Sequence, residues 1–159
     1  MTSLIRTTSD HPDFQKLSAI FDEFLVDIDG DEKDFFAQFN QIYIDHVVLF
    51  YVDETAVGCG AFKKYEDSVA ELKRLFVLPE FRAKGIANKI IQELELWIHK
   101  ENYQTIILET ATKLLPAIAL YSKLGYSQFP NYGVYKQVES SYCMRKTTSK
   151  IKNLLSETL

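Results

Sequence analysis

Cysteine and histidine are scarce and scattered in this chain of 159 residues, and their scarcity narrows its chemistry. The two cysteines, Cys59 and Cys143, lie far apart and outside any CxxC pair, which argues against a metal site or a disulfide framework. A buried, inert thiol is the expected state of each. The three histidines form no cluster, and we assign them no chemistry.

Long apolar runs and an excess of positive charge are also absent. No stretch approaches the length of a membrane span, and the first residues lack the apolar segment of a signal peptide. We therefore expect a cytoplasmic protein with no membrane partner. The net charge of −4 argues against nucleic acid as the main partner, because phosphate binding needs a basic face. With 47% apolar and 25% charged residues, the chain has the composition of one globular domain.

The apolar pattern predicts strands and helices in an order typical of a mixed α/β fold. Strands are expected at Leu4–Thr7, His46–Val52, Ala56–Tyr65, Val69–Val77, Thr105–Leu108, Tyr126–Phe129 and Ser141–Arg145. Helices are expected at Phe14–Ile28, Asp31–Phe39, Ile86–Ile98 and Pro116–Leu124. The short turns between the second, third and fourth strands indicate an antiparallel meander.

These elements predict an α/β domain: a single mixed, mostly antiparallel sheet of six to seven strands, flanked by helices. The domain is expected to cover residues 1–146. Residues 147–159 are polar with a few leucines, and we expect a C-terminal tail that is either a frayed helix or disordered.

A segment after the fourth predicted strand has the features of an anion site. Arg82-Ala83-Lys84-Gly85-Ile86-Ala87 leads from a short loop into the start of a helix. The first N–H groups of a helix lack internal partners and lie at the positive end of the helix dipole, which favours an anion. A helix start with a solvated basic pair explains this segment equally well. The Walker and GxGxxG patterns are both absent, so an NTPase or dinucleotide site gains no support.

A second motif, Ala117-Ile118-Ala119-Leu120-Tyr121-Ser122-Lys123-Leu124-Gly125-Tyr126, lies downstream. The Arg-x-x-Gly-x-Ala segment after a strand, followed by this Ala-x-x-Leu-Tyr-x-Lys-x-Gly-Tyr segment, resembles the GNAT superfamily of acyl-CoA N-acyltransferases. The resemblance covers Val47–Tyr126 well and the outer parts mainly by element order. One departure is Leu114, which stands where many members have an asparagine that contacts the cofactor.

The resemblance implies where acetyl-CoA, the expected cosubstrate, is held. The strand end Leu75-Phe76-Val77 offers backbone groups to the pantetheine arm. The residues expected to wrap the pyrophosphate are Arg82, Ala83, Lys84, Gly85, Ile86 and Ala87, with Asn88 beside them. The fourth and fifth strands are expected to splay apart, and the thioester to enter the gap. No metal is implied, and the family allows a homodimer.

The resemblance also makes Tyr121 the expected proton donor to the departing thiolate; a core tyrosine is the alternative. Glu71 is the expected base, acting through water on the amine, and Glu109 is the second candidate. A solvated strand carboxylate, paired with Lys73, explains Glu71 equally well. Simple alternation places Glu71, Lys73, Leu75 and Val77 on one face of the strand. Tyr132 and Tyr135 are expected either to line the acceptor site or to pack.

Three functions remain open from the sequence, and the third of them is a different α/β phosphate binder. The first is an N-acetyltransferase that moves an acetyl group from acetyl-CoA to a primary amine of a small molecule or peptide by direct attack. In that reaction a strand N–H near Phe76 or Val77 stabilises the oxyanion. The second is an acyl-CoA-binding module without catalysis. The presence of Tyr121 favours the first.

Overall fold

A computed structural model describes residues 1–40 and 42–149 of the chain. Contacts divide the chain into two compact units. The first unit consists of Met1–Lys63 and Lys73–Leu94, and the second consists of Lys64–Leu72 and the chain from Glu95 onward. The prediction that residues 1–146 form one domain stays a prediction.

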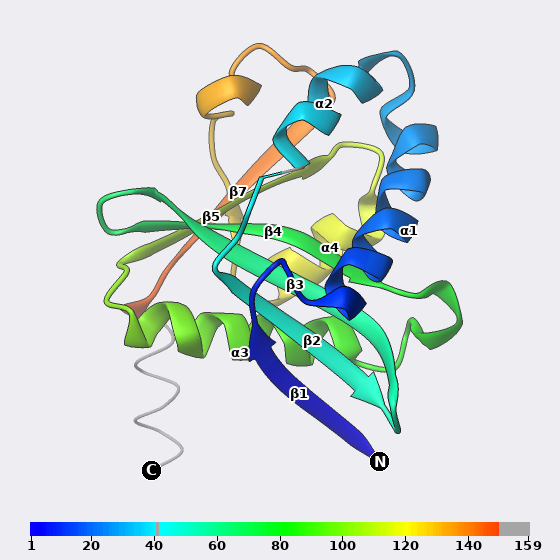
Figure 1. Cartoon of the computed structure of the whole chain (residues 1–159). Helices are drawn as coiled ribbons and strands as arrows, with labels where there is room; N and C mark the ends of the chain where they lie inside the picture. The colour runs from blue at the N-terminus through cyan, green and yellow to red at the C-terminus, as the bar shows by residue number, and fades with distance from the viewer. Residues whose placement is uncertain (41, 150–159) are drawn as a thin grey trace. The chain divides into compact units, whose positions relative to one another are not determined.

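The part of the chain that the structure describes holds one seven-stranded sheet in the order β1-β2-β3-β4-β5-β7-β6 (Figure 1). The strands are β1 (Thr2–Thr7), β2 (His46–Val52), β3 (Thr55–Glu66), β4 (Val69–Val77), β5 (Thr105–Ala111), β6 (Ser127–Gln128) and β7 (Ser141–Thr147). The pairs β1–β2, β2–β3, β5–β7 and β6–β7 are antiparallel, and β4–β5 is parallel. The predicted fold class, a mixed and mostly antiparallel sheet flanked by helices, is confirmed.

The parallel pairing of β4 with β5 joins Val69–Glu71 to Thr105–Ile107. All of these residues belong to the second unit. The expected splay of the two strands beyond these pairs stays a prediction.

The described helices begin and end close to the predicted residues. They are α1 (Pro12–Asp29), α2 (Lys33–Asn40), α3 (Ile86–Lys100) and α4 (Leu115–Lys123), with short 3₁₀ turns at Gly30–Glu32, Pro79–Phe81 and Gly133–Tyr135. His11 caps α1, because its Nδ1 accepts a hydrogen bond from the Asp13 N–H at 3.1 Å. Gly30 follows α1 with a φ of 56°, the left-handed conformation that favours glycine. No described helix combines the length and apolar character needed to cross a membrane.

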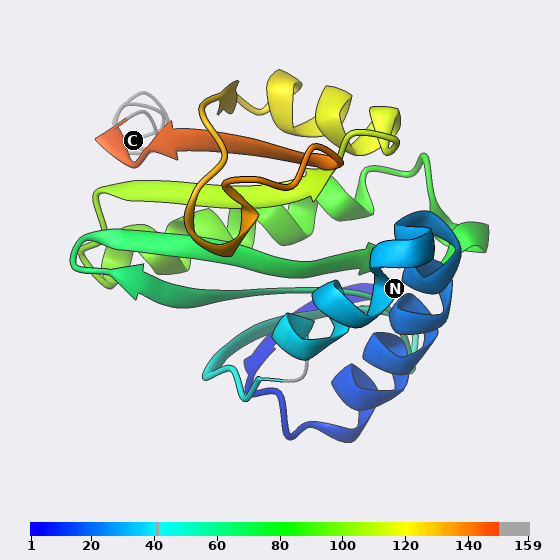
Figure 2. The same cartoon turned by 90° about the horizontal axis from the view of Figure 1, so that it is seen from above.

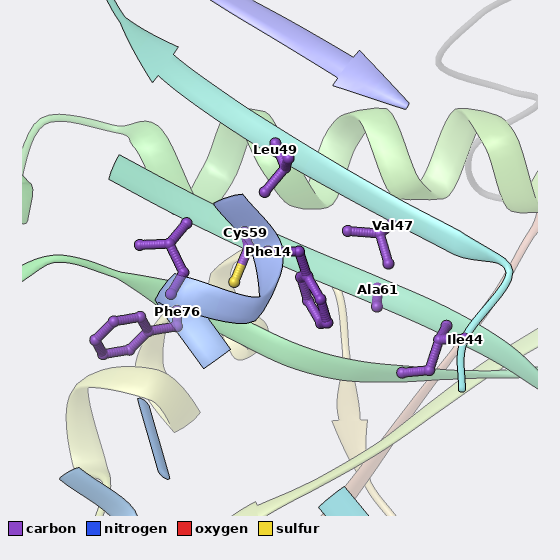
Figure 3. Packing of buried hydrophobic residues seen from close by; sticks show 8 residues of the cluster. Phe14, Ile44, Val47, Leu49, Cys59, Ala61 and Phe76 are labelled. Atoms are coloured by element: carbon purple, nitrogen blue, oxygen red, sulfur yellow. The ribbon is translucent and has the colours of Figure 1, made fainter. Parts of the chain in front are cut away.

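In the first unit, α1 and α3 cover opposite faces of β3. Cys59 and Ala61 pack with Phe14 and Leu17 of α1 in a buried cluster that also holds Ile44, Val47, Leu49 and Phe76 (Figure 3). Gly60, between them in sequence, lies against α3: a Cβ there would meet Ile90 Cγ2 at 2.8 Å and Leu94 Cδ1 at 2.9 Å. A glycine is required because α3 packs directly on the strand backbone.

In the second unit, β5 and β7 lie side by side and form the core (Figure 2). The fully buried side chains there include Ile106, Leu108 and Met144. β7 continues to Thr147, and the next residue, Thr148, donates a hydrogen bond from Oγ1 to the Tyr103 carbonyl at 2.8 Å. The first two residues of the predicted tail are therefore held in the fold, and residues 150–159 lie outside the described part.

Both cysteines are free and buried, as predicted. Burial raises the pKa of the Cys59 thiol to about 12 and that of Cys143 to about 11. Cys59 Sγ donates to the Arg74 carbonyl at 3.3 Å. Neither thiol is therefore ionised near neutral pH, and both act as small packing groups.

Candidate active site

The strand β4 is interrupted by a left-handed residue. Arg74 has a φ of 58°, which a strand residue other than glycine rarely adopts. The alternation of faces assumed along the whole strand is therefore broken at Arg74, and the predicted shared face of Glu71 with Leu75 and Val77 does not follow. Such an irregularity re-aims side chains and backbone groups locally.

Arg74 is buried and held by α1. Its Nη2 donates to Asp22 Oδ1 at 2.8 Å, to Ser18 Oγ at 2.6 Å and to the Ser18 carbonyl at 2.8 Å. Its guanidinium lies 4.8 Å from the centre of the Phe21 ring. These contacts fix the C-terminal half of β4 against α1. The sequence pattern did not predict them, because nothing in it distinguishes Arg74 from the other charged residues.

The three predicted backbone donors lie at the end of this strand. Phe76 and Val77 are buried, and Leu75 is half-buried. The Phe76 ring stacks on Phe21 at 4.9 Å with 17° between the planes. The stacking of Phe76 on Phe21 therefore anchors the end of β4 to α1 and fixes its backbone.

The segment Arg82–Ala87, predicted to bind an anion, contains two residues with a positive φ. It follows the 3₁₀ turn Pro79–Phe81 and ends at Ile86, where α3 begins. Ala83 has a φ of 61° and Gly85 a φ of 78°, on either side of Lys84, whose φ is not positive. Residues of alternating hand turn successive N–H groups toward one side and form a concave anion site. A Cβ on Gly85 would meet no atom within 4 Å, so the backbone there is open to approach.

Arg82 holds this loop against β4 rather than standing free in solvent. Its Nε donates to the Val77 carbonyl at 2.9 Å. Its guanidinium lies 5.4 Å from the centre of the Phe24 ring and 5.7 Å from that of Phe76. One donor is thus committed to the strand end, and the two rings fix the plane of the side chain.

The first turn of α3 contains the remaining predicted cofactor residues. Ile86 is buried, and a Cβ on Gly58 would lie 3.3 Å from its Cγ2. Ala87 and Asn88 are half-buried. Asn88 Oδ1 is buried and accepts no hydrogen bond within the described residues. Ile86 is a packing residue whose backbone alone is available to a ligand.

Tyr121 lies in α4 and is buried. Burial, and next the nearby Glu109 carboxylate, raise the pKa of the Tyr121 hydroxyl above its usual value. Among residues 1–40 and 42–149, no hydrogen bond engages this hydroxyl. It therefore stays protonated at neutral pH and is available to donate. Leu114, at the N-cap of α4, makes no side-chain cap, in keeping with the departure noted above.

Glu71 is buried rather than solvated. The Tyr132 hydroxyl donates to Glu71 Oε2 at 2.5 Å. Burial, followed by the charge of Glu71 and this hydrogen bond, raises the pKa of Tyr132 far above its usual value. The expectation of a solvated carboxylate is wrong, because a tyrosine from the loop after β6 covers it.

The second candidate base, Glu109, accepts a hydrogen bond from Ser141 Oγ at 2.6 Å. Tyr135 is buried, and its ring meets that of Tyr132 edge to face at 5.6 Å. Burial first, then Glu109 and Glu71, raise the pKa of Tyr135. Both candidate carboxylates therefore raise the pKa of Tyr135, which packs against Tyr132. The sequence indicated these residues only as two tyrosines in a loop.

The comparison with known families shows which family the chain belongs to. Residues 14–126 match the model of the acetyltransferase (GNAT) family. That match covers more than half of the chain, and the chain therefore belongs to the GNAT acetyltransferase family. The resemblance drawn from the two motifs is confirmed.

Two relatives show how far the similarity extends. An uncharacterised N-acetyltransferase of Schizosaccharomyces pombe is 31% identical over 107 residues, which are 65% of this chain and 65% of that protein. The IAA acetyltransferase of Azospirillum brasilense is 32% identical over 93 residues, 58% of this chain and 61% of that protein. The matches span less than two thirds of either relative. The family match and relatives named N-acetyltransferase or acetyltransferase confirm the expected class, an acetyl-CoA-dependent N-acyltransferase.

Solved structures share the fold. A protein assigned as an acyl-CoA N-acyltransferase from Klebsiella pneumoniae matches with a TM-score of 0.78 at 24% identity, covering 93% of this chain and 98% of that one. A GNAT family acetyltransferase from Elizabethkingia anophelis, crystallised with acetyl-CoA bound, matches with a TM-score of 0.69 at 14% identity, covering 92% and 97%. At these identities the likeness concerns the fold.

Proposed function

We propose that this protein transfers an acetyl group from acetyl-CoA to a primary amine of a small molecule or a peptide. The observation that carries the proposal is the loop Arg82–Ala87, where Ala83 and Gly85 are left-handed directly before the start of α3. In a member of the GNAT family, a loop of this form is suited to the pyrophosphate of coenzyme A, because several N–H groups face one anion. Lys84 is exposed and adds positive charge.

The proposed chemistry is direct attack. The neutral amine nitrogen adds to the thioester carbonyl, and the resulting oxyanion accepts a hydrogen bond from a β4 N–H near Phe76 or Val77. The C–S bond then breaks and the thiolate leaves. Glu71 takes the amine proton through water.

Tyr121 interacts with the departing sulfur. Its raised pKa makes it a weaker acid than a thiol, whose ordinary pKa is about 8.5. Its contribution is therefore a hydrogen bond to the developing thiolate. The departed thiolate takes its proton from solvent, and Glu71 returns the amine proton to solvent. This role needs a protonated hydroxyl without another partner, which is the state described above.

A nitrogen acceptor is in keeping with the name N-acetyltransferase of the Schizosaccharomyces pombe relative, and a primary amine is the acceptor that we propose. The buried carboxylate Glu71 and the half-buried carboxylate Glu109, which both raise the pKa of Tyr135, favour an acceptor that carries a positive charge in solution. A cytoplasmic location and a homodimer remain parts of the proposal, argued from the sequence and the family.

Thiol release from acetyl-CoA over a panel of primary amines tests the proposal, with wild type beside Tyr121→Phe. Turnover on at least one amine, with kcat reduced at least about tenfold in Tyr121→Phe, is the expected result. Acetyl-CoA binding without turnover on any amine would instead indicate an acyl-CoA-binding module. The absence of both binding and turnover would refute the cofactor role of the loop.

A further inference from the structure

The end of α4 joins Tyr121 directly to Tyr126. The Tyr126 N–H donates to the Tyr121 carbonyl at 3.0 Å, and the Gly125 N–H donates to the Ser122 carbonyl at 3.1 Å. Gly125 has a φ of 96°, so this is the left-handed helix stop in which two N–H groups bond back into the last turn. The two tyrosine rings meet edge to face, 5.7 Å apart.

A buried ion pair fixes Tyr126 from its other side. The Tyr126 hydroxyl donates to Glu95 Oε2 at 2.8 Å, and Lys146 Nζ donates to the same oxygen at 2.8 Å. The side chains of Glu95 and Lys146 are only 8% and 5% exposed. A charged hydrogen bond within a buried site holds its partners in narrow geometry, because leaving either charge unpaired is costly.

Lys146 also binds the helix end itself. Its Nζ donates to the Leu124 carbonyl at 2.8 Å, one of the carbonyls at the C-terminus of α4 that lack a partner within the helix. A cation at this end also interacts favourably with the helix dipole. Lys146 runs beside Gly125, since a Cβ there would lie in ordinary contact with Lys146 Cε, at 3.7 Å.

We propose that Lys146, Glu95 and Tyr126 are positioning residues for Tyr121. Lys146 from β7 and Glu95 from α3 clamp the end of α4, and Tyr126 transmits their position to the Tyr121 ring. The inference rests on the proposed role of Tyr121 toward the thiolate. Stability alone does not require this buried cluster of charges. Apolar residues of similar volume often fill such a space with no loss of folding stability.

A double-mutant cycle with Tyr121→Phe tests the inference. Lys146→Met and Tyr126→Phe are each measured in the wild-type and the Tyr121→Phe backgrounds, with kcat and the KM for acetyl-CoA as readouts. Small displacements of a catalytic group lower kcat strongly, so we expect Lys146→Met to lower it about tenfold and Tyr126→Phe about threefold, at unchanged KM. Neither change is expected to lower kcat further once Tyr121 is phenylalanine.

Thr148→Val is the matched control. It also removes one hydroxyl hydrogen bond of 2.8 Å in the second unit, and the partner in that bond is the Tyr103 carbonyl, which belongs neither to α4 nor to the Lys146–Glu95–Tyr126 cluster. Its kcat is expected to stay within about twofold of wild type. Tyr126→Phe keeps the ring and both charges, so it serves if Lys146→Met does not fold.

The outcomes separate the two claims. Equal losses of kcat in both backgrounds, or no loss from a folded Tyr126→Phe or Lys146→Met protein, overturn the positioning role and leave the proposed function standing. An active enzyme whose kcat is unaffected by Tyr121→Phe overturns the role of Tyr121 and the inference with it. Non-additive losses, with Thr148→Val at the wild-type rate, establish the positioning role.

Discussion

Replacing Arg82 separates two reasons for a cation at this position. If Arg82 acts only by attracting the pyrophosphate, any positive charge serves. The structure instead commits its Nε to the Val77 carbonyl and places its guanidinium beside the rings of Phe24 and Phe76. A positioning role depends on that planar geometry, which lysine cannot reproduce.

The size of the effect follows from these contacts. The exposed charged hydrogen bond contributes about 1 kcal/mol, after allowance for solvent screening, and each ring contact about 0.5 kcal/mol. Together they hold the loop with about 2 kcal/mol, which corresponds to roughly a thirtyfold change in binding. We expect Arg82→Ala to raise the KM for acetyl-CoA about thirtyfold and to change kcat less than about threefold.

Steady-state kinetics with varied acetyl-CoA measures this, with Arg82→Lys and Lys84→Gln beside it. Arg82→Lys is expected to recover less than about threefold of the lost affinity, because lysine restores the positive charge but not the planar guanidinium with its several N–H donors. Lys84→Gln is the charge control, since Lys84 is exposed and its ammonium lies 5.5 Å from the Phe81 ring. An unchanged KM in Arg82→Ala, or full recovery in Arg82→Lys, would refute the loop-positioning argument.

Three further predictions concern the base, the core and alkaline stability. Glu71→Gln should lower kcat about a hundredfold and Glu109→Gln less than about threefold; the reverse order in an activity assay would make Glu109 the base. Gly60→Ala should destabilise the fold by about 2 kcal/mol in urea unfolding, because its Cβ would meet Ile90 at 2.8 Å, and an unchanged midpoint would contradict that packing. Burial raises the pKa of Cys59 from 9.0 to about 12, so the unfolded state loses its proton first and stability falls from pH 9 to pH 12. In Cys59→Ala, the free energy of unfolding should fall less steeply between pH 9 and pH 12, by about 1.4 kcal/mol per pH unit. The same pH dependence in Cys59→Ala and wild type would contradict the raised pKa of Cys59.

Most of the fold was predictable because it depends on local patterns. Apolar spacing of 3.6 residues gave α1 and α3, and the short turns around β3 gave the meander. The left-handed φ of Arg74 was not predictable, since glycine is absent there and an ion pair between the buried Arg74 side chain and the partly exposed Asp22 stabilises the strand instead. The assumed alternation along β4 failed at that residue.

The candidate site was predictable where it depends on a short motif. The small residues of Arg82–Ala87 lie close together in sequence and indicate an unusual backbone, and the structure has a positive φ at Ala83 and Gly85. The role of this loop as a cofactor site stays a prediction. The partners of Glu71 and Tyr126 were not predictable, because they come from residues distant in sequence whose pairing only the fold decides. Lys146 and Glu95, for example, are separated by 51 positions.

The central claim is that the loop Arg82–Ala87 binds the pyrophosphate of coenzyme A. Its most direct test compares kcat/KM for acetyl-CoA and for S-acetyl-pantetheine, which lacks the pyrophosphate, in wild type and Gly85→Ala. Alanine at a φ of 78° strains the loop by about 1–2 kcal/mol without a steric clash. We predict a loss of about tenfold with acetyl-CoA and none with S-acetyl-pantetheine. An equal loss with both substrates would contradict the account.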